Sequence, residues 1–120
     1  MNPEQMALEH RIYDALQSVL DYRGYSCFER NVLYIPGREE RFPYTEIDFM
    51  ARYADSVCVY EIKQSHNHHA KRKAIKQLLR AREAVLRYNP EASVRMFYVY
   101  GKGKGFRLEW IRAYSHKASS

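Results

Sequence analysis

The residues of this sequence best suited to chemistry are an aspartate, a glutamate and a lysine in two neighbouring strand-like segments. Asp48 lies within residues 45–53, and Glu61 and Lys63 come at the end of residues 56–63. Side chains alternate along a strand, so Glu61 and Lys63 are expected to share one face. If the two segments pair as a hairpin, the carboxylates of Asp48 and Glu61 can approach each other.

Strict alternation in the first segment places Asp48 opposite Ile47 and Phe49 and on the same face as Glu46. Two carboxylates held close together repel unless a cation lies between them. Oxygen ligands without His or Cys partners favour Mg²⁺ or Mn²⁺ over zinc. Such an ion can polarise a phosphoryl oxygen and lower the pKa of bound water. Lys63 could then orient or deprotonate that water, or offset charge on the phosphate.

A third acid, Glu9, lies on the apolar stripe of the first predicted helix, which is formed by positions 12, 13, 16 and 20. Either Glu9 faces the same site, or this end of the stripe emerges into solvent, and both explanations stay open. Glu4 is the alternative acid, but an acid in the first turn is already explained by the helix dipole.

The surrounding pattern predicts an α/β protein formed by a single domain over residues 1–120. A helix is expected from Pro3, capped by Asn2 and ended by Gly24. A second helix is expected over 70–88, with an inward face made of Ile75, Leu78, Leu79, Val85 and Leu86. Strands are expected at 25–35, 45–53, 56–63, 94–100 and 106–113, with a polar loop at 38–43 and a frayed tail from about 114. This order indicates one mixed sheet with helices packed on it and a right-handed crossover between the third and fourth strands.

The stretches Thr45–Arg52 and Val57–Lys63 resemble the core signature of the PD-(D/E)XK nuclease superfamily. They are similar to the small archaeal Holliday-junction resolvases and to related small bacterial endonuclease-like proteins. The resemblance extends from Glu9 to about Tyr100, and only its central part is specific. It implies a restriction-endonuclease-like αβββαβ core, here followed by one extra C-terminal strand. Ile47 replaces the proline that names the motif, at a position that varies widely in the superfamily.

The resemblance also implies a role for individual residues. The metal ligands would be Asp48, Glu61, Glu9 and the main-chain carbonyl of Ile62. Lys63 would be the catalytic lysine, and Gln77 matches a glutamine that some subfamilies place near the site on the following helix. The implied activity is Mg²⁺- or Mn²⁺-dependent hydrolysis of phosphodiester bonds in DNA, including branched or junction DNA.

The distribution of positive charge favours a nucleic-acid partner. The chain has 20 Lys and Arg against 14 acids. Spacings of three, four and seven place Lys73, Lys76, Arg80 and Arg87 on one face of the second helix. The alternative is a helix face that is merely solvated. The predicted nucleic-acid contacts, drawn from this helix, the 38–44 loop and the 101–105 turn, are Lys71, Arg72, Lys73, Lys76, Arg80, Arg41, Lys102 and Lys104.

Two alternatives to an endonuclease remain, a non-catalytic basic module that binds nucleic acid and an accessory subunit on the same fold. We expect a homodimer, because cutting two strands with a domain this small usually needs two sites. No apolar run approaches the length of a membrane span and no secretory signal is visible, so we expect a cytoplasmic protein, of a host cell if a virus encodes it, without a membrane partner.

The remaining histidines and cysteines carry less chemistry in this interpretation. His66, His68 and His69 are expected to be solvated loop residues. Cys27 and Cys58 are expected to be buried free thiols, because no spacing among them suggests zinc.

Overall fold

A computed structural model of the chain describes residues 3–34, 45–64 and 66–112. Its elements, in chain order, are α1 (Pro3–Tyr22), β1 (Cys27–Tyr34), β2 (Thr45–Tyr53), β3 (Ser56–Lys63), α2 (His68–Tyr88), β4 (Ser93–Lys102) and β5 (Gly105–Ile111). The predicted order of helices and strands is confirmed, and β2 and β3 have the predicted bounds. The predicted Asn2 cap, the 38–43 loop and the tail from about 114 lie outside the described residues.

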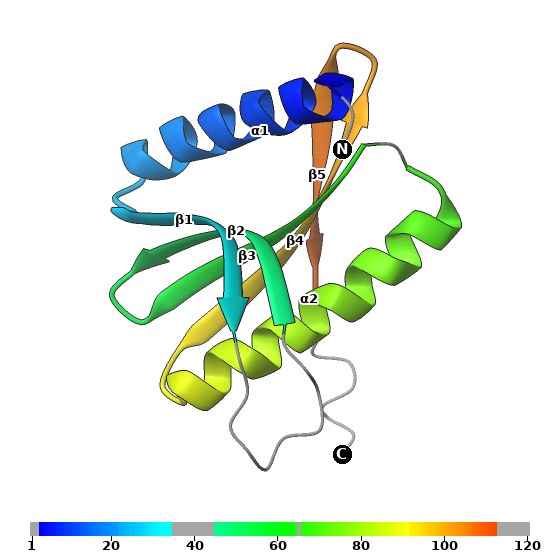
Figure 1. Ribbon diagram of the computed structural model, residues 1–120. Coiled ribbons are helices and arrows are strands. Elements are labelled where there is room, and N and C mark those ends of the chain that lie inside the picture. The colour runs from blue at the N-terminus through cyan, green and yellow to red at the C-terminus, as the bar shows by residue number, and fades with distance from the viewer. Residues whose placement is uncertain (1–2, 35–44, 65, 113–120) are drawn as a thin grey trace.

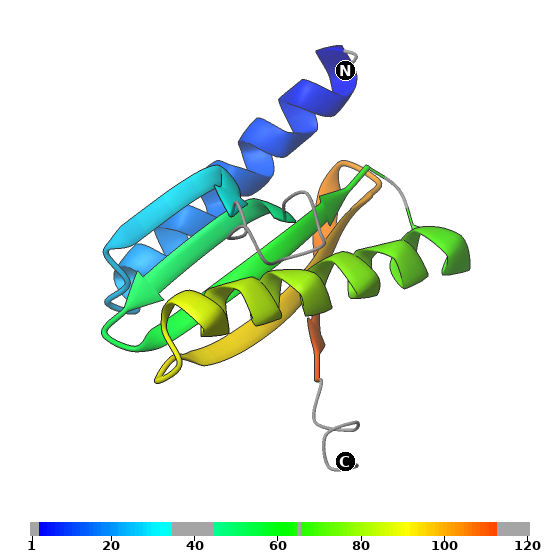
Figure 2. The ribbon, with the colours of Figure 1, turned by 60° about the horizontal axis from the view of Figure 1, so that its bottom comes forward.

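The five strands form one mixed sheet in the order β1-β2-β3-β4-β5 (Figure 1). Only β3 and β4 pair in parallel, and the other neighbours are antiparallel. Parallel strands need a long crossover connection, which α2 supplies here. The α/β class is therefore confirmed, with α1 on one face of the sheet and α2 on the other (Figure 2).

The α1 face holds one apolar cluster, which we call the α1-side core. The helix contributes large side chains at helical spacing, namely Leu8, Ile12, Tyr13, Leu16 and Leu20. They pack on residues of the three central strands, namely Phe49, Ala51, Cys58, Tyr60, Ile62 and Val99. Burial of this stripe explains why the predicted helix forms where the apolar period is strongest.

The opposite cluster, the α2-side core, corrects the predicted inward face of the second helix. Its helical residues are Ala74, Leu78, Ala81 and Val85, packed on strand residues that include Val57, Val59, Met96 and Tyr98. Leu79 is 37% exposed, and Ile75 and Leu86 are only half-buried. Alanines occupy the positions nearest the sheet, so the helix is turned away from the orientation that the largest apolar side chains predicted.

A bend in β2 corrects the prediction of strict alternation. Ile47 belongs to the α2-side core, whereas Phe49 belongs to the α1-side core, although two residues of a flat strand separated by one position share a face. The β2–β3 ladder runs from Tyr53 only as far as the pair Phe49 and Tyr60. Figure 1 shows β1 and β2 bending together. Asp48 therefore lies at the turn between the two faces, and not opposite both Ile47 and Phe49.

The cysteine prediction was half right. Cys58 is a buried free thiol on the central strand β3, whereas Cys27 is a free thiol exposed at the start of the edge strand β1. An edge strand has a neighbour on one side only, so its end is poorly covered. None of the helices in the described part of the chain is long and apolar enough to cross a membrane.

Candidate active site

The strand register brings Asp48 and Glu61 together. In the antiparallel β2–β3 pair, Phe49 is opposite Tyr60, so Asp48 and Glu61 are the next residues along. The Ile62 main-chain N–H donates a hydrogen bond of 2.8 Å to Oδ2 of Asp48. This bond holds the aspartate against β3, directly beside Glu61, at the point where the bent β2 leaves the flat part of the sheet.

Lys63 is held between a strand and a helix. Its Nζ lies 3.5 Å from Oε2 of Glu61 and donates a hydrogen bond of 3.1 Å to Oε1 of Gln77. Gln77 comes from α2, so the crossover helix orients the amine that follows the acid on β3. The structure thus brings together all three residues of the predicted strand motif and adds the glutamine that the resemblance singled out.

Burial raises the pKa of both carboxyl groups of the site. Glu61 is only 5% exposed, and its burial, reinforced by the charge of Asp48, raises its pKa to about 8 although Lys63 opposes the shift. Burial also raises the pKa of Asp48 to about 6, against the opposing effect of the Ile62 N–H. The buried Glu61 and the half-buried Asp48 share a single lysine, so the site carries more negative than positive charge when both ionise.

Glu9, on α1, lies close enough to Asp48 for its charge to act on that carboxyl group. Its side chain is half-buried, and its Oε1 accepts a hydrogen bond of 3.3 Å from the hydroxyl of Tyr13. After burial, the charge of Glu9 is the largest contribution that raises the pKa of Asp48. Its half-burial and its effect on Asp48 support the first of the two explanations, in which Glu9 faces the site. Glu9 contributes to the field of the site from the opposite layer.

The donor set suits a hard divalent cation more than it suits zinc. Within residues 3–34, 45–64 and 66–112, no three His, Cys, Asp or Glu side chains converge into a metal-binding group. Mg²⁺ usually keeps several waters and takes only one or two carboxylates from the protein. Among the described residues, the contacts above leave Oδ1 of Asp48 and Oε1 of Glu61 without a hydrogen bond. Together with the Ile62 carbonyl, these oxygens match that ligand chemistry, and a cation would offset the excess negative charge.

The contacts of His66 with two tyrosines next to the motif were not predicted from the sequence. In the parallel β3–β4 register, Tyr98 is opposite Glu61 and Tyr100 is opposite Lys63. Nδ1 of His66 is hydrogen-bonded to the Tyr98 hydroxyl at 3.0 Å, and its ring stacks on Tyr100 at 4.4 Å between centroids. His66 is thus exposed but held on two side chains, and is not simply solvated. Only knowledge of the strand register could have shown this.

The predicted nucleic-acid contacts fall into separate places. Arg72, Lys73, Lys76 and Arg80 are exposed along α2, which fits either a nucleic-acid contact or a solvated helix face. Lys71 forms an ion pair of 3.1 Å with Glu109 of β5, so part of its charge is already offset. Lys102 and Lys104 are exposed at the β4–β5 turn. Arg41 lies outside the described residues.

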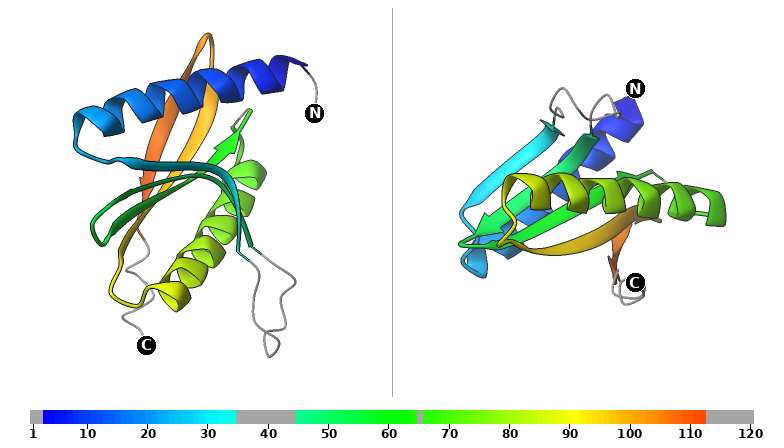
Figure 3. Two further views of the ribbon diagram at one scale, coloured as in Figure 1. Left: turned by 60° about the vertical axis from the view of Figure 1, so that its left-hand side comes forward. Right: turned by 90° about the horizontal axis from the view of Figure 1, so that it is seen from below.

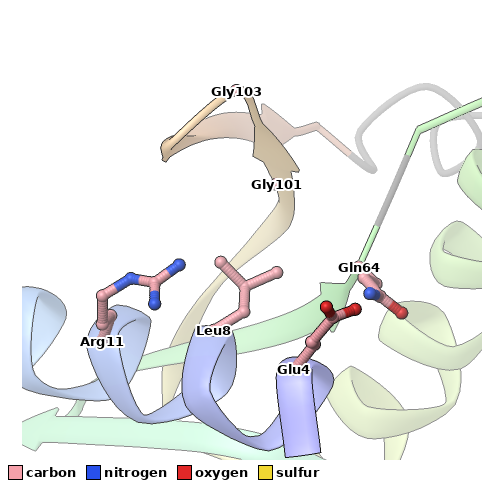
Figure 4. A pocket seen from close by; sticks show the side chains of 6 residues that line it. All are labelled: Glu4, Leu8, Arg11, Gln64, Gly101 and Gly103. Carbon is pink, nitrogen blue, oxygen red and sulfur yellow. The ribbon is translucent and has the colours of Figure 1, made fainter. Parts of the chain in front are cut away.

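A cavity of about 480 Å³ lies beyond the end of β3, between the start of α1 and the β4–β5 hairpin (Figure 4). It is lined by Glu4, Leu8, Arg11, Gln64, Gly101 and Gly103. A side chain at Gly101 would come within 2.5 Å of the Gln64 carbonyl oxygen, so glycine permits this close approach. Glu4 lines the cavity, whereas Glu9 is the acid that acts on Asp48. The role of Glu9 as the third acid of the site stays a prediction.

Comparison with known proteins identifies no family for this chain. No model of a known protein family matches this sequence, and no curated protein matches it. The resemblance to the PD-(D/E)XK nucleases therefore stays a prediction from the motif, supported by the contacts of Asp48, Glu61, Lys63 and Gln77.

Proposed function

We propose that this protein is a Mg²⁺- or Mn²⁺-dependent endonuclease of the PD-(D/E)XK type that hydrolyses phosphodiester bonds in DNA. A single observation carries the proposal. Asp48, half-buried, and Glu61, buried, are adjacent acids with raised pKa values, and their one lysine is held by a glutamine from the crossover helix. Groups with strongly shifted pKa values concentrate at functional sites, because burying them without a function is unfavourable.

The protein groups that would hold the ion are Asp48, Glu61 and the main-chain carbonyl of Ile62, with Glu9 close by. A bound ion would polarise the phosphoryl oxygen and lower the pKa of a water ligand. Lys63 has a different task. Glu61 and Gln77 hold its Nζ in place at distances of 3.5 and 3.1 Å. A positioned amine can orient the attacking water and offset the charge that develops on the phosphate.

The charge on α2 supports DNA as the substrate. Arg72, Lys73, Lys76 and Arg80 are exposed on the helix that also supplies Gln77. Phosphates that follow this helix would lead a strand towards Lys63, and such contacts position a nucleic acid without reading its sequence. We extend the proposal to branched or junction DNA, to a restriction-endonuclease-like core and to a homodimer in the cytoplasm. Light scattering during turnover checks the dimer, and a monomer would contradict it.

The test is cleavage of branched, duplex and single-stranded DNA, each with Mg²⁺ and with a chelator. We expect metal-dependent cleavage by the parent and cleavage at least roughly a hundredfold slower by Asp48→Asn or Glu61→Gln. Glu83→Gln is the matched control, because Glu83 is an exposed acid on α2 and its loss changes the net charge equally. If both site variants cut like the parent, the enzyme is not of this type.

A second function, a non-catalytic nucleic-acid-binding module or accessory subunit on the same fold, is favoured by one observation. Within the described residues, the acids do not converge into a group of three that could hold a metal. Salt-dependent DNA binding without cleavage under any divalent ion would establish the binding module. Absence of both binding and cleavage would favour the accessory subunit.

A further inference from the structure

The sheet face on the α1 side is left open near the end of the chain. Trp110 and Leu108 of β5 are 49% and 43% exposed. They are opposite Phe97 and Val99 of β4, which pack with the α1-side core, so all four side chains are on that face. Figure 3 shows α1 crossing the sheet near the β4–β5 hairpin, while the other end of β5 lies away from it. Helix α1 thus covers only part of this face.

Two arginines flank the exposed indole. The guanidinium carbon of Arg112 lies 4.2 Å from the centre of the Trp110 ring, and that of Arg95 lies 5.9 Å from it. Both arginines are exposed, and neither takes part in a salt bridge with another described residue. None of the residues that follow Glu109 in the sequence is acidic. We call Arg95, Phe97, Leu108, Trp110 and Arg112 the Trp110 surface.

We propose that the Trp110 surface binds a single-stranded nucleic acid, with a base stacked on the indole and the neighbouring phosphates bound by Arg95 and Arg112. A flat aromatic side chain beside cations is the arrangement that binds unpaired bases without sequence preference. A base in a duplex is already stacked on both sides, so the indole can reach only an unpaired one. The surface lies on the opposite face of the sheet from Lys63 and α2, so it is separate from the candidate active site.

Charge decides between this partner and a second copy of the chain. A two-fold interface brings the same patch of each copy together. Pairing through the Trp110 surface would therefore set Arg95 and Arg112 against the same cations of the other copy, where like charges repel. A polyanion gains from both arginines and from the indole.

Trp110 is the only tryptophan of the chain, so its fluorescence reports on this surface alone. The experiment titrates the full chain with oligothymidylate at low salt and with a chelator present, which prevents metal-dependent cleavage. Binding is followed in parallel by the anisotropy of a labelled oligonucleotide. We expect the emission of Trp110 to be quenched over the same concentration range in which anisotropy rises. A duplex of equal length should quench it much less.

The variants separate stacking from charge. Trp110→Ala should weaken binding of oligothymidylate at least about fivefold, since stacking one base contributes about 1–3 kcal/mol. Trp110→Phe keeps a ring and should lose less, which also guards against a folding defect in the alanine variant. Arg95→Ala and Arg112→Ala should each lower the salt slope of binding by about 0.7. Arg107→Ala, at an exposed arginine of β5 on the other face, is the matched control and should bind like the parent.

The proposal is overturned if anisotropy shows saturation while the emission of Trp110 stays unchanged, or if Trp110→Ala binds as tightly as the parent. Equal quenching by the duplex also overturns it, as does an emission shift that follows protein concentration alone, which would show self-association. The proposal rests on the proposed function only for the assumption that the partner is a nucleic acid. It is tested by binding and not by cleavage. Quenching without cleavage under any divalent ion would reject the proposed nuclease activity and support the Trp110 surface. Cleavage without quenching would support the nuclease activity and reject the Trp110 surface.

Discussion

The two faces of the sheet handle charge in opposite ways. On the α2 side, Glu61 and Lys63 are packed closely together, with Asp48 beside them at the bend of β2, so that each alters the proton affinity or position of the others. On the α1 side, Arg95 and Arg112 lie in solvent around Trp110. Water screens charges at the surface and hardly reaches those in the interior. The closely packed charges of the candidate site should therefore act as a unit. The exposed charges around Trp110 should contribute nearly independently.

The largest effect is expected from removing one of the two carboxylates of the site. Glu61→Gln or Asp48→Asn should reduce metal-dependent cleavage by roughly a hundredfold or more, since each would remove one of two acidic ligands. Thermal unfolding without metal at pH 5, below both raised pKa values, should show little loss of stability, because the amides then replace carboxyl groups that are already neutral. Initial rates and the melting temperature measure the two effects.

A double variant tests whether the two acids of the site act as a unit. The double variant Asp48→Asn/Glu61→Gln should be no worse than either single variant, because the two groups serve one ion. Additive losses of activity would show that each acid acts alone. The charges of the candidate site would then be as independent as those around Trp110.

A smaller effect is expected from Gln77, which positions Lys63. Gln77→Leu removes the acceptor of the 3.1 Å hydrogen bond and should lower activity by about 10–100-fold, as expected for a group that orients a catalytic residue. The loss should be in kcat, with KM nearly unchanged, since the contact does not reach the DNA. Leu79→Ala, at an exposed position on the same helix, is the control. A change confined to KM would contradict a positioning role.

The pH dependence of stability should distinguish the buried acids from exposed ones. Without metal, folding raises the pKa of Asp48 from 3.8 to about 6 and that of Glu61 from 4.5 to about 8. The folded protein then holds protons that the unfolded chain releases, so the free energy of unfolding should fall as pH rises from about 4 to about 8. Added Mg²⁺ binds the ionised form and should restore stability most at the upper end of this range.

Melting temperatures between pH 4 and 9, with Mg²⁺ and with chelator, measure this slope. Glu61→Gln should flatten it between pH 6 and 8, and the histidines are the same in both proteins. An identical slope in parent and variant would mean that Glu61 ionises freely in the fold.

The smallest effect on stability is expected on the other face. Arg112→Ala should change the free energy of unfolding by no more than about 0.5 kcal/mol, because exposed substitutions rarely do more. Its consequence should be visible only in the salt dependence of nucleic-acid binding. Denaturant unfolding at fixed pH measures the first quantity. A loss of several kcal/mol would show that Arg112 belongs to the packed structure rather than to an open surface.

Local patterns were sufficient to predict much of the fold. The strands at 45–53 and 56–63 were predicted to the residue, because branched and aromatic residues bounded by a two-residue turn leave little choice. Ala54 in that turn adopts a positive φ of 53°. The pairing of Asp48 with Glu61 followed from this hairpin, since its register is set by the turn.

Other features depended on contacts between distant segments. The bend that separates Ile47 from Phe49 arises where β2 leaves β3, and alternation along one strand does not reveal it. The outward orientation of Leu79 depends on the alanines that bring α2 close to the sheet. The hydrogen bond of His66 with Tyr98 and its stacking on Tyr100 depend on the parallel register of β3 with β4.

By itself, the sequence determined which groups could do chemistry and on which segments they lie, because residue type and strand period are local properties. The tertiary structure alone decided how far each group is buried, which partner holds it and what stays uncovered. Those depend on packing across 14 or more positions of the chain, as between Lys63 and Gln77. Burial is also what raises the pKa of Glu61, and incomplete cover by α1 is what leaves Trp110 exposed.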